Sequence, residues 1–426
     1  MNAVHSLALA LALAFVAPVH ADYLPDPAAA EAALWASPTV AQARGEFAAQ
    51  TLRSQGLQRG YAEWGVSADV AQRRIQTPLR ESQPEWGVAL SRPLRLPAVA
   101  AADRTLASAL TAHAEANLGE ALHESGRQLL TLWFDWLNEA SQTQMWQAQL
   151  QLTQQQLDAV NARIRLGEAP RAERVNAEAA LAQIRLQQQQ AGLRMQQAHS
   201  RLLAQFPALP VPPDRGLPQP LPPAGSADAY VDAVLEHNHE LARARRQADV
   251  LQAEAWQLAK RRNADPSVGV FYKNEVGGDE HVLGLNVGLT LPGAARRYNQ
   301  QAAQQLSVTA QDAAMRLEQR LRQEARADFE KAAAQAGNWE QAERAAHLLE
   351  EAARLAARAY SLGEGGLDQV LLTRRLALDG RVHAQQAQDA ALPADTLLKQ
   401  DENELWTLSP RRLNPRSDSF RHLGEP

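Results

Sequence analysis

The stretch from Glu236 to Glu240 holds the residues most suggestive of metal chemistry, because it reads Glu-His-Asn-His-Glu. Imidazole and carboxylate groups are common ligands of zinc and similar cations. His237 and His239 are two residues apart, however, and a helix brings two side chains to one face at spacings of three or four. A solvated helix start that Asn238 caps is the alternative. We expect no metal site here and no cofactor.

No other arrangement of residues indicates catalysis. The sequence has no serine–histidine–acid spacing, no glycine-rich phosphate loop and no paired catalytic carboxylates. It has no cysteine, which excludes disulfides, thiolate nucleophiles and thiolate metal sites. A formal net charge of −5 over 426 residues gives no reason to expect nucleic acid as a partner. The sequence therefore predicts a protein that is not an enzyme.

One short phrase occurs twice, because residues 166–168 and 362–364 both read Leu-Gly-Glu. Each copy ends a very long run of helix-forming sequence, and a second helical run follows it. Glycine adopts the left-handed conformation that ends a helix without a steric penalty. We therefore expect Gly167 and Gly363 to lie at the tips of two long helical hairpins, and these tips to carry the function.

The first 21 residues are predicted to be a secretory signal peptide. An apolar run from Leu7 to Val16 precedes Val19 and Ala21, which occupy the −3 and −1 positions of a cleavage site after Ala21. A retained membrane anchor is the alternative, but it needs about 20 apolar residues. No later stretch is long and apolar enough for a membrane helix. If the exported protein spans a membrane, it must do so with strands.

Apolar residues recur every seven positions along the helical run from about Ala98 to Leu166. A strict seven-residue repeat predicts a coiled-coil-like helix, and roughly 65 residues give about 100 Å. A single free coiled coil is the alternative, and it leaves the predicted strands unexplained. The repeat comprises Leu122, Leu129, Trp136, Thr143, Leu150, Leu157 and Ile164 in the first helix, and Ala172, Ala179, Leu186 and Leu193 as the packing seam of the return helix.

Two pairs of strands are predicted from alternating sequence. The first pair is 61–66 and 85–90, with Trp86, Val88 and Leu90 on one face. The second pair is 268–275 and 282–291, joined through Gly277-Gly278-Asp279. In its second strand one face is apolar and the other holds small or polar residues; the apolar face comprises Leu283, Leu285, Val287, Leu289 and Leu291.

The two halves of the chain repeat one programme of helix, strand pair, long helix, turn and return helix, at an offset of about 196 residues. We divide the chain into a first repeat (22–206), a proline-rich linker (207–225), a second repeat (226–392) and a C-terminal helix remnant with a polar tail (393–426). Alternating strands of this kind are typical of membrane β-barrels. Four strands cannot close a barrel, since about eight is the minimum. Either the sheet packs on helices of its own chain, or several chains pool their strands.

The two turns together resemble a known family. Residues 166–168 followed by Val175, and residues 360–364 followed by Leu371, resemble the paired turn motif of TolC-like outer-membrane factors. Residues 277–293 are similar to the second hairpin of the heavy-metal (cobalt–zinc–cadmium) efflux branch. The resemblance covers nearly all of 28–392.

The resemblance implies a mainly α fold with a small membrane β part. Three copies would form a twelve-stranded barrel in outer-membrane lipid and an α-helical periplasmic tunnel. Such a duct passively conducts cargo that it receives from an inner-membrane pump of the RND type. The resemblance to the heavy-metal branch implies that heavy-metal cations are the cargo. Gly167, Glu168, Gly363 and Glu364 would contact the periplasmic adaptor protein. Type I protein secretion and a soluble periplasmic coiled-coil scaffold are the alternatives.

The resemblance also implies a set of entrance residues. Tyr360 occupies the position of the family's entrance tyrosine, and Glu173 stands where an acidic constriction residue is common. The usual acidic positions after Gly363 hold Gln369 and Leu372, and the nearest acid is Asp368. We therefore expect Tyr360, Glu173 and Asp368 to gate the entrance, without a strong ring of aspartates.

Overall fold

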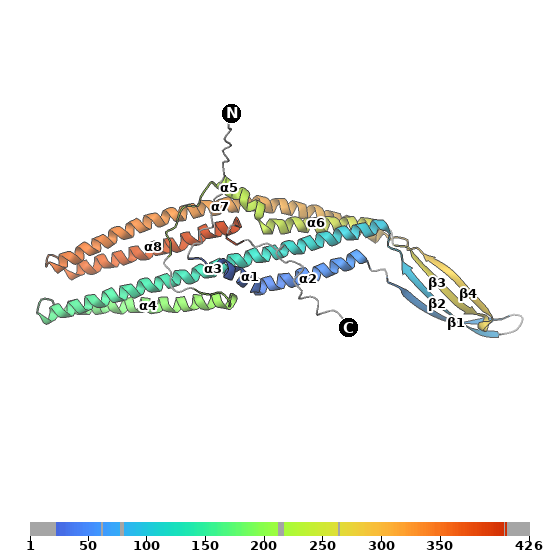
Figure 1. Cartoon of the computed structure of the whole chain (residues 1–426), viewed down its shortest axis with the longest axis horizontal. Helices are drawn as coiled ribbons and strands as arrows, with labels where there is room; N and C mark the ends of the chain where they lie inside the picture. The colour runs from blue at the N-terminus through green and yellow to red at the C-terminus, as the bar shows by residue number, and fades with distance from the viewer. Residues whose placement is uncertain are drawn as a thin grey trace, which may run out of the picture.

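The protein is an elongated bundle of helices from one end of which a four-stranded sheet projects (Figure 1). The computed structural model describes residues 23–60, 63–76, 81–211, 217–262, 265–403 and 405–406. The expected signal peptide, Tyr61 and the end of the polar tail lie outside these residues. Among the described residues, no helix is both long and apolar enough to cross a membrane.

The order of elements is the predicted duplication. The first half contains α1 (Pro27–Ala36), α2 (Pro38–Arg59), β1 (Gly65–Ile75), β2 (Glu81–Pro93), α3 (Pro97–Arg165) and α4 (Arg171–Gln205). The second half contains α5 (Ala227–His237), α6 (His239–Lys260), β3 (Ser267–Glu275), the short 3₁₀ turn Val276–Gly278, β4 (Glu280–Gly288), α7 (Ala294–Ser361) and α8 (Leu367–Asp401). Helix α8 passes through Pro393, so the C-terminal helix remnant is its last part.

A side-chain N-cap begins a new helix in front of each strand pair, at the start of α2 and of α6. Ser37 Oγ accepts a hydrogen bond from the backbone N–H of Val40 at 3.4 Å, and Asn238 Oδ1 accepts one from that of Leu241 at 2.7 Å. An oxygen at the N-cap satisfies an N–H group that has no partner inside the helix. The two caps lie at equivalent points of the two repeats, which confirms Asn238 as a capping residue.

The predicted repeat of α3 is largely buried. Leu122, Leu129 and Leu157 face neighbouring helices, and the largest core cluster gathers around Trp133 and Phe134, where α1, α3 and the end of α4 meet. Helix α3 has 69 residues and α7 has 68, so each measures about 100 Å at 1.5 Å per residue. These lengths agree with the expected long hairpins.

The predicted seam of the return helix is wrong. Leu186 and Leu193 are 52% and 56% exposed, and Ala172 and Ala179 are exposed too. Helix α4 instead packs through another stripe, which comprises Ala177, Leu181, Ala191, Ala198 and Leu202. Seven-residue spacing identifies an apolar stripe but not its partner. Helix α4 therefore carries a second apolar stripe that no described part of the chain covers.

The helices form a curved wall with two edges. Helix α3 packs against α4 and α8, and α8 packs against α7. Nearer the sheet, α3 packs against α2 and α6, and α6 packs against α7. The order along the wall is thus α4–α3–α8–α7 at one end and α2–α3–α6–α7 at the other (Figure 1). Helices α2 and α4 form one edge, and α7 forms the other.

The sheet has the order β1-β2-β3-β4, with all neighbours antiparallel, so β2 and β3 join the two repeats. Strand β1 starts at Gly65 and runs to Ile75, well beyond the predicted segment, because its polar sequence hides the alternation. Strand β4 ends at Gly288, where its partner strand begins at Ser267. Leu289 and Leu291 therefore follow the strand instead of belonging to it, although both are exposed.

A buried carboxylate holds the junction between helices and sheet. Asp103 in α3 is 1% exposed and accepts hydrogen bonds from Arg95, Arg261 and Gln257 at 2.6–3.0 Å. Arg95 also donates to two carbonyls of the last turn of α2. Burial alone would raise the pKa of Asp103, but these hydrogen bonds and the nearby arginines hold it below its usual value. The ends of α2, β2 and α6 are thereby tied to α3.

Candidate functional site

Both predicted turns have the same backbone structure at the hairpin tips. Gly167 and Gly363 have φ values of 77° and 80°. The N–H of each glycine donates to the carbonyl three residues before it, and the N–H of the following glutamate donates to the carbonyl five residues before it, at 2.9–3.1 Å. This is the Schellman motif, which ends a helix with a residue of positive φ. The motif explains why the phrase requires glycine at its centre.

A hydrogen bond joins the two hairpins beside their tips. The hydroxyl of Tyr360 in α7 donates to Glu173 Oε2 in α4 at 2.7 Å. A hydrogen bond to an ionised carboxylate is stronger than a neutral one. The structure therefore brings together Tyr360 and Glu173, two of the three predicted entrance residues.

Arg163 is a third member of this cluster, which the sequence reading did not include. Its guanidinium carbon lies 4.3 Å from the ring centroid of Tyr360, and its Nη1 atom lies 3.9 Å from Glu173 Oε2. A cation over an aromatic face is attracted by the ring quadrupole. Comparison of the two repeats was the available signal, because the position four residues before the turn glycine holds Arg163 in one copy and Ala359 in the other.

An apolar cluster underlies the hydrogen bond. Residues of α3, α4 and α8 form it, namely Leu157, Val160, Ala177, Leu181 and Leu367, and Tyr360 packs against them. A second polar contact joins α8 to α3 nearby, where Arg374 Nη1 donates to Gln156 Oε1. Burial lowers the pKa of Arg374. The tips are therefore joined by packing as well as by polar contacts.

The other predicted tip residues lie on the surface. Glu168 and Glu364 are exposed immediately after the turn glycines, and Asp368 is exposed in the first turn of α8. The Tyr360–Glu173 hydrogen bond does not involve Asp368. Three exposed carboxylates thus lie at the ends of the hairpins, outside the Tyr360–Glu173 hydrogen bond that joins them.

One face of the sheet is apolar. Antiparallel partners share a face, and the register places Val66, Leu90, Val270 and Leu285 side by side across the four strands. The remaining apolar side chains of this face are Ala68, Val70, Trp86, Val88, Val268, Tyr272, Leu283 and Val287. Leu283, Leu285 and Val287 are 70–81% exposed. Leu283, Leu285 and Val287 of the predicted row lie on this face, and the strand ends at Gly288.

Aromatic side chains mark both ends of the apolar face. At the hairpin end, the rings of Trp86 and Tyr272 lie 5.6 Å apart, and the Tyr272 hydroxyl lies 2.8 Å from His281 Nδ1. At the helix end, the Arg92 guanidinium lies 5.2 Å from the ring of Trp64. Six residues of β2 separate Trp86 from Arg92, which is about 20 Å at 3.3 Å per residue. An apolar band thus lies between two aromatic borders.

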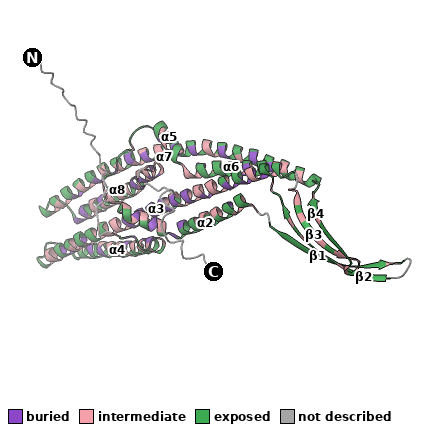
Figure 2. Ribbon diagram, turned by 45° about the vertical axis from the view of Figure 1, so that its right-hand side comes forward, coloured by how far each residue is buried: buried purple, intermediate pink, exposed green. Residues whose placement is uncertain are grey.

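The opposite face is polar and rich in small residues. Arg73 pairs with Glu85 at 2.5 Å and with Glu275 at 3.2 Å across three strands. The helices cover neither face, since the sheet extends away from them and is largely exposed (Figures 1 and 2). The alternative in which the sheet packs on helices of its own chain is therefore wrong for the single chain.

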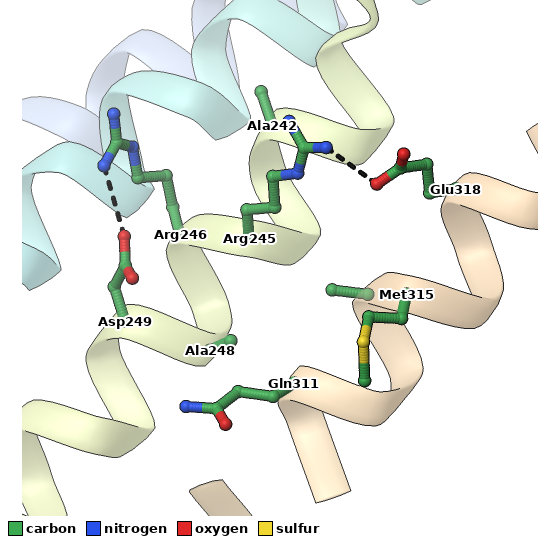
Figure 3. A pocket seen from close by; sticks show the side chains of 9 residues that line it. Ala242, Arg245, Arg246, Ala248, Asp249, Gln311, Met315 and Glu318 are labelled. Carbon is green, nitrogen blue, oxygen red and sulfur yellow. Dashed lines mark hydrogen bonds and ion pairs between the residues drawn. The ribbon is translucent and has the colours of Figure 1, made fainter. Parts of the chain in front are cut away.

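A groove with a volume of about 510 Å³ lies elsewhere, between α6 and α7 (Figure 3). Its charged side chains are paired, Arg245 with Glu318 at 2.8 Å and Arg246 with Asp249 at 3.1 Å. Met315 lines the α7 side. Because its charges are already matched, we read the groove as a solvated crevice between two helices.

The histidines of the stretch 236–240 contact other groups. His239 packs its ring against that of His123 at 5.6 Å, and His237 Nδ1 lies 3.0 Å from the carbonyl of Ala233 in its own helix. Among the residues that the structure describes, no group of three or more histidines and acids is placed to hold a metal ion.

Comparison with known proteins identifies the fold. No family model matches this sequence, and no curated protein matches it significantly. Solved structures do match. The outer membrane protein VceC of Vibrio cholerae is 16% identical with a TM-score of 0.69, covering 89% of this chain and 99% of its own. The Campylobacter jejuni CmeC outer membrane channel is 12% identical, with a TM-score of 0.69 and coverage of 90% and 87%.

A third match is the open state of the Neisseria gonorrhoeae MtrE outer membrane channel. It is 18% identical with a TM-score of 0.59, and 90% of each chain is covered. The chain therefore has the fold of outer-membrane channels over nearly its whole length. The mainly helical fold that the turn motifs implied is confirmed.

Proposed function

We propose that this chain is one protomer of a homotrimeric outer-membrane duct, through which cargo leaves the periplasm passively. The observation that carries the proposal is the two-faced sheet, which stands clear of the helices with an apolar band between aromatic borders. An outward apolar band with aromatic girdles and a polar interior is the pattern of a transmembrane barrel. A soluble scaffold would have no use for such an uncovered face.

The sheet edges support closure with further copies. Strands β1 and β4 each have one partner in the chain, so each leaves a row of backbone N–H and C=O groups open. In lipid, each unsatisfied group costs several kcal/mol. Pairing β4 of one copy with β1 of the next removes both edges, and three copies supply twelve strands. Such head-to-tail contacts close into a ring.

The edges of the helical wall support the same ring. Leu348 and Leu355 of α7 and Leu362 at its C-cap lie seven residues apart and are all exposed. The uncovered stripe of α4, which includes Leu186 and Leu193, also has a spacing of seven. Because α4 and β1 lie at one edge and α7 and β4 at the other, the two stripes meet when the sheet edges pair. Matching seven-residue stripes form a coiled-coil seam.

The seam predicts a change in oligomeric state. Replacing both Leu186 and Leu355 by glutamate places a charge on each side of the interface, where burial of an unpaired charge is strongly unfavourable. We expect the detergent-solubilised protein to change from trimer to monomer by light scattering. Leu221→Glu is the control, since Leu221 is 72% exposed in the linker. A double variant that stays trimeric contradicts the seam, and a soluble periplasmic monomer in the parent contradicts the duct.

The cluster at the tips supports a gated entrance formed by Tyr360 and Glu173, with Asp368 at its surface. The hydrogen bond from Tyr360 fastens one hairpin to the other. We expect Tyr360→Phe to loosen it by about 2 kcal/mol, or roughly thirtyfold in the open population. The measurement is the open probability in planar bilayers. Ser361→Ala is the matched control, because the Ser361 hydroxyl bonds within its own helix. Equal open probabilities in both variants would rule out the gate.

The exposed turns are accessible to a partner protein that binds the ends of the hairpins. In a trimer, six tips carrying Glu168 or Glu364 would ring the mouth. A periplasmic adaptor that docks on Gly167, Glu168, Gly363 and Glu364 and links them to an RND-type pump fits this arrangement. The likeness of 277–293 to the heavy-metal branch supports metal cations as cargo. Metal and drug sensitivity of a deletion strain tests this against type I protein secretion.

A further inference from the structure

One transverse row of the polar face contains a single large side chain. The register places Ser67, Ala89, Phe271 and Gly284 side by side across the four strands. Three of these residues are small, and the fourth is a phenylalanine, the one aromatic side chain among the residues that the register places on this face. Phe271 therefore needs an explanation that the alternation of the strand does not provide.

The ring of Phe271 lies on the backbone of Gly284. A Cβ atom added to Gly284 would stand 2.3, 2.6 and 3.1 Å from ring atoms Cζ, Cε1 and Cε2 of Phe271. The three nearest atoms all belong to this ring. The Lys273 ammonium lies 5.9 Å from the ring centroid. Because the far end of its ring rests against the neighbouring strand, Phe271 is only partly exposed, although it belongs to an uncovered face.

Other glycines of this face are confined differently. At Gly269 an added Cβ would stand 2.7 Å from the backbone carbonyl of Leu90, so the strand itself is in the way. At Gly87 and Gly288 the nearest groups are the small polar side chains of Asp69 and Ser267. At Gly284 the three nearest atoms belong to the far end of an aromatic side chain, so a Cβ there meets the ring before it meets any backbone atom.

We propose that Gly284 keeps the ring of Phe271 flat against the wall, and that this pair sets the width of the duct at the middle of the sheet. The inference rests on the proposed function, in which the polar face lines an aqueous lumen. Strands close off the other directions, so a displaced ring moves into the lumen. In a closed trimer three rings would narrow the passage at one level. The pair thus decides how large a cargo passes.

Thiol chemistry tests this pair, because the chain has no cysteine of its own. In membranes, Ala89→Cys reports on the lumen beside Phe271, and Leu90→Cys reports on the apolar face. The probe is a membrane-impermeant, charged methanethiosulfonate. We expect position 89 to react quickly and position 90 to be protected. Adding Gly284→Val should slow the reaction at position 89 several-fold, and adding Phe271→Ala as well should restore it.

A matched variant distinguishes displacement of the Phe271 ring from the added volume of the valine side chain. Gly65→Val adds the same side chain to the same face, where the nearest atom is Ser91 Oγ at 3.4 Å, and it should leave the rate unchanged. An unchanged rate in Gly284→Val, or slowing that persists without the ring, overturns the proposal. Should Gly284→Val fail to assemble, rescue of assembly by Phe271→Ala supports it, and no rescue overturns it. If position 90 reacts and position 89 does not in the parent, the proposed duct itself fails.

Discussion

Replacing Val287 by lysine is expected to reduce recovery of the protein from outer membranes. Val287 is 70% exposed on the apolar face of β4 and pairs with Val268 of β3. Val287 lies in the transverse row of Val268 and Arg92, at the helix-side border of the apolar face. A lysine on the lipid face of a barrel costs about 2–4 kcal/mol at the midplane and about 0–1 kcal/mol near the interfaces. A trimer incurs this lower cost three times. The measurement is the amount of protein in the outer-membrane fraction after separation from the periplasm.

The neighbouring residue provides a matched control for Val287. Asn286 belongs to the same strand but to the polar face, opposite Gly269. Asn286→Lys introduces the same charge one position away, and a polar lumen should tolerate it. The duct predicts reduced assembly in Val287→Lys alone. If both variants distribute between the outer-membrane and periplasmic fractions as the parent does, the soluble scaffold is favoured, and failure of both would show only that β4 tolerates no lysine.

The strands show which part of the sheet a sequence can reveal. Alternation identified the apolar row of β4 because Leu283, Leu285 and Val287 are large residues between small ones. Most of strand β1 was not predicted, because polar residues such as Asp69, Arg73 and Arg74 interrupt the alternation of apolar and polar residues. Its place is set by pairing with β2, which is a long-range contact. The glycine beneath Phe271 depends on cross-strand register in the same way.

The helices show a similar limit. Seven-residue spacing predicted long hairpins, and the structure has them. The stripe with Leu186 and Leu193 was assigned to the wrong partner because spacing does not identify what covers a stripe. A chain that assembles with copies of itself needs one apolar stripe that packs against its own helices and another that packs against a neighbouring copy. The exposed stripe of α4 is therefore informative about assembly.

At the hairpin tips, too, some residues could be predicted from local sequence and others depend on long-range contacts. The turn glycines were predictable from local chemistry, since only their backbone conformation was needed. Tyr360 and Glu173 were selected through a family resemblance, and their hydrogen bond exists only because α7 meets α4 there. Arg163 was not predicted because its contact is with the Tyr360 ring of the other hairpin, and the sequence around Arg163 alone does not indicate such a contact. Asp368 lies in the first turn of α8 and is exposed.

Gly363→Pro is expected to abolish export while leaving membrane assembly intact. Gly363 has a φ of 80°, whereas proline fixes φ near −65°. Proline also lacks the N–H that Gly363 donates to the carbonyl of Tyr360 at 3.1 Å. The helix end and the position of Tyr360 must therefore both change. The sheet lies at the other end of α7, about 100 Å away for 68 residues, and should still assemble.

The conservative replacement at the same site makes this prediction specific to backbone conformation. Asparagine keeps the N–H group and tolerates positive φ better than other residues with a side chain. Gly363→Asn should therefore export at close to the parental rate, and Gly167→Pro should reproduce the loss in the first hairpin, where φ is 77°. Export is measured as cargo efflux from cells, and assembly as trimer in the outer-membrane fraction. Unchanged efflux in both proline variants would remove the tips from the mechanism, because neither turn can survive the substitution.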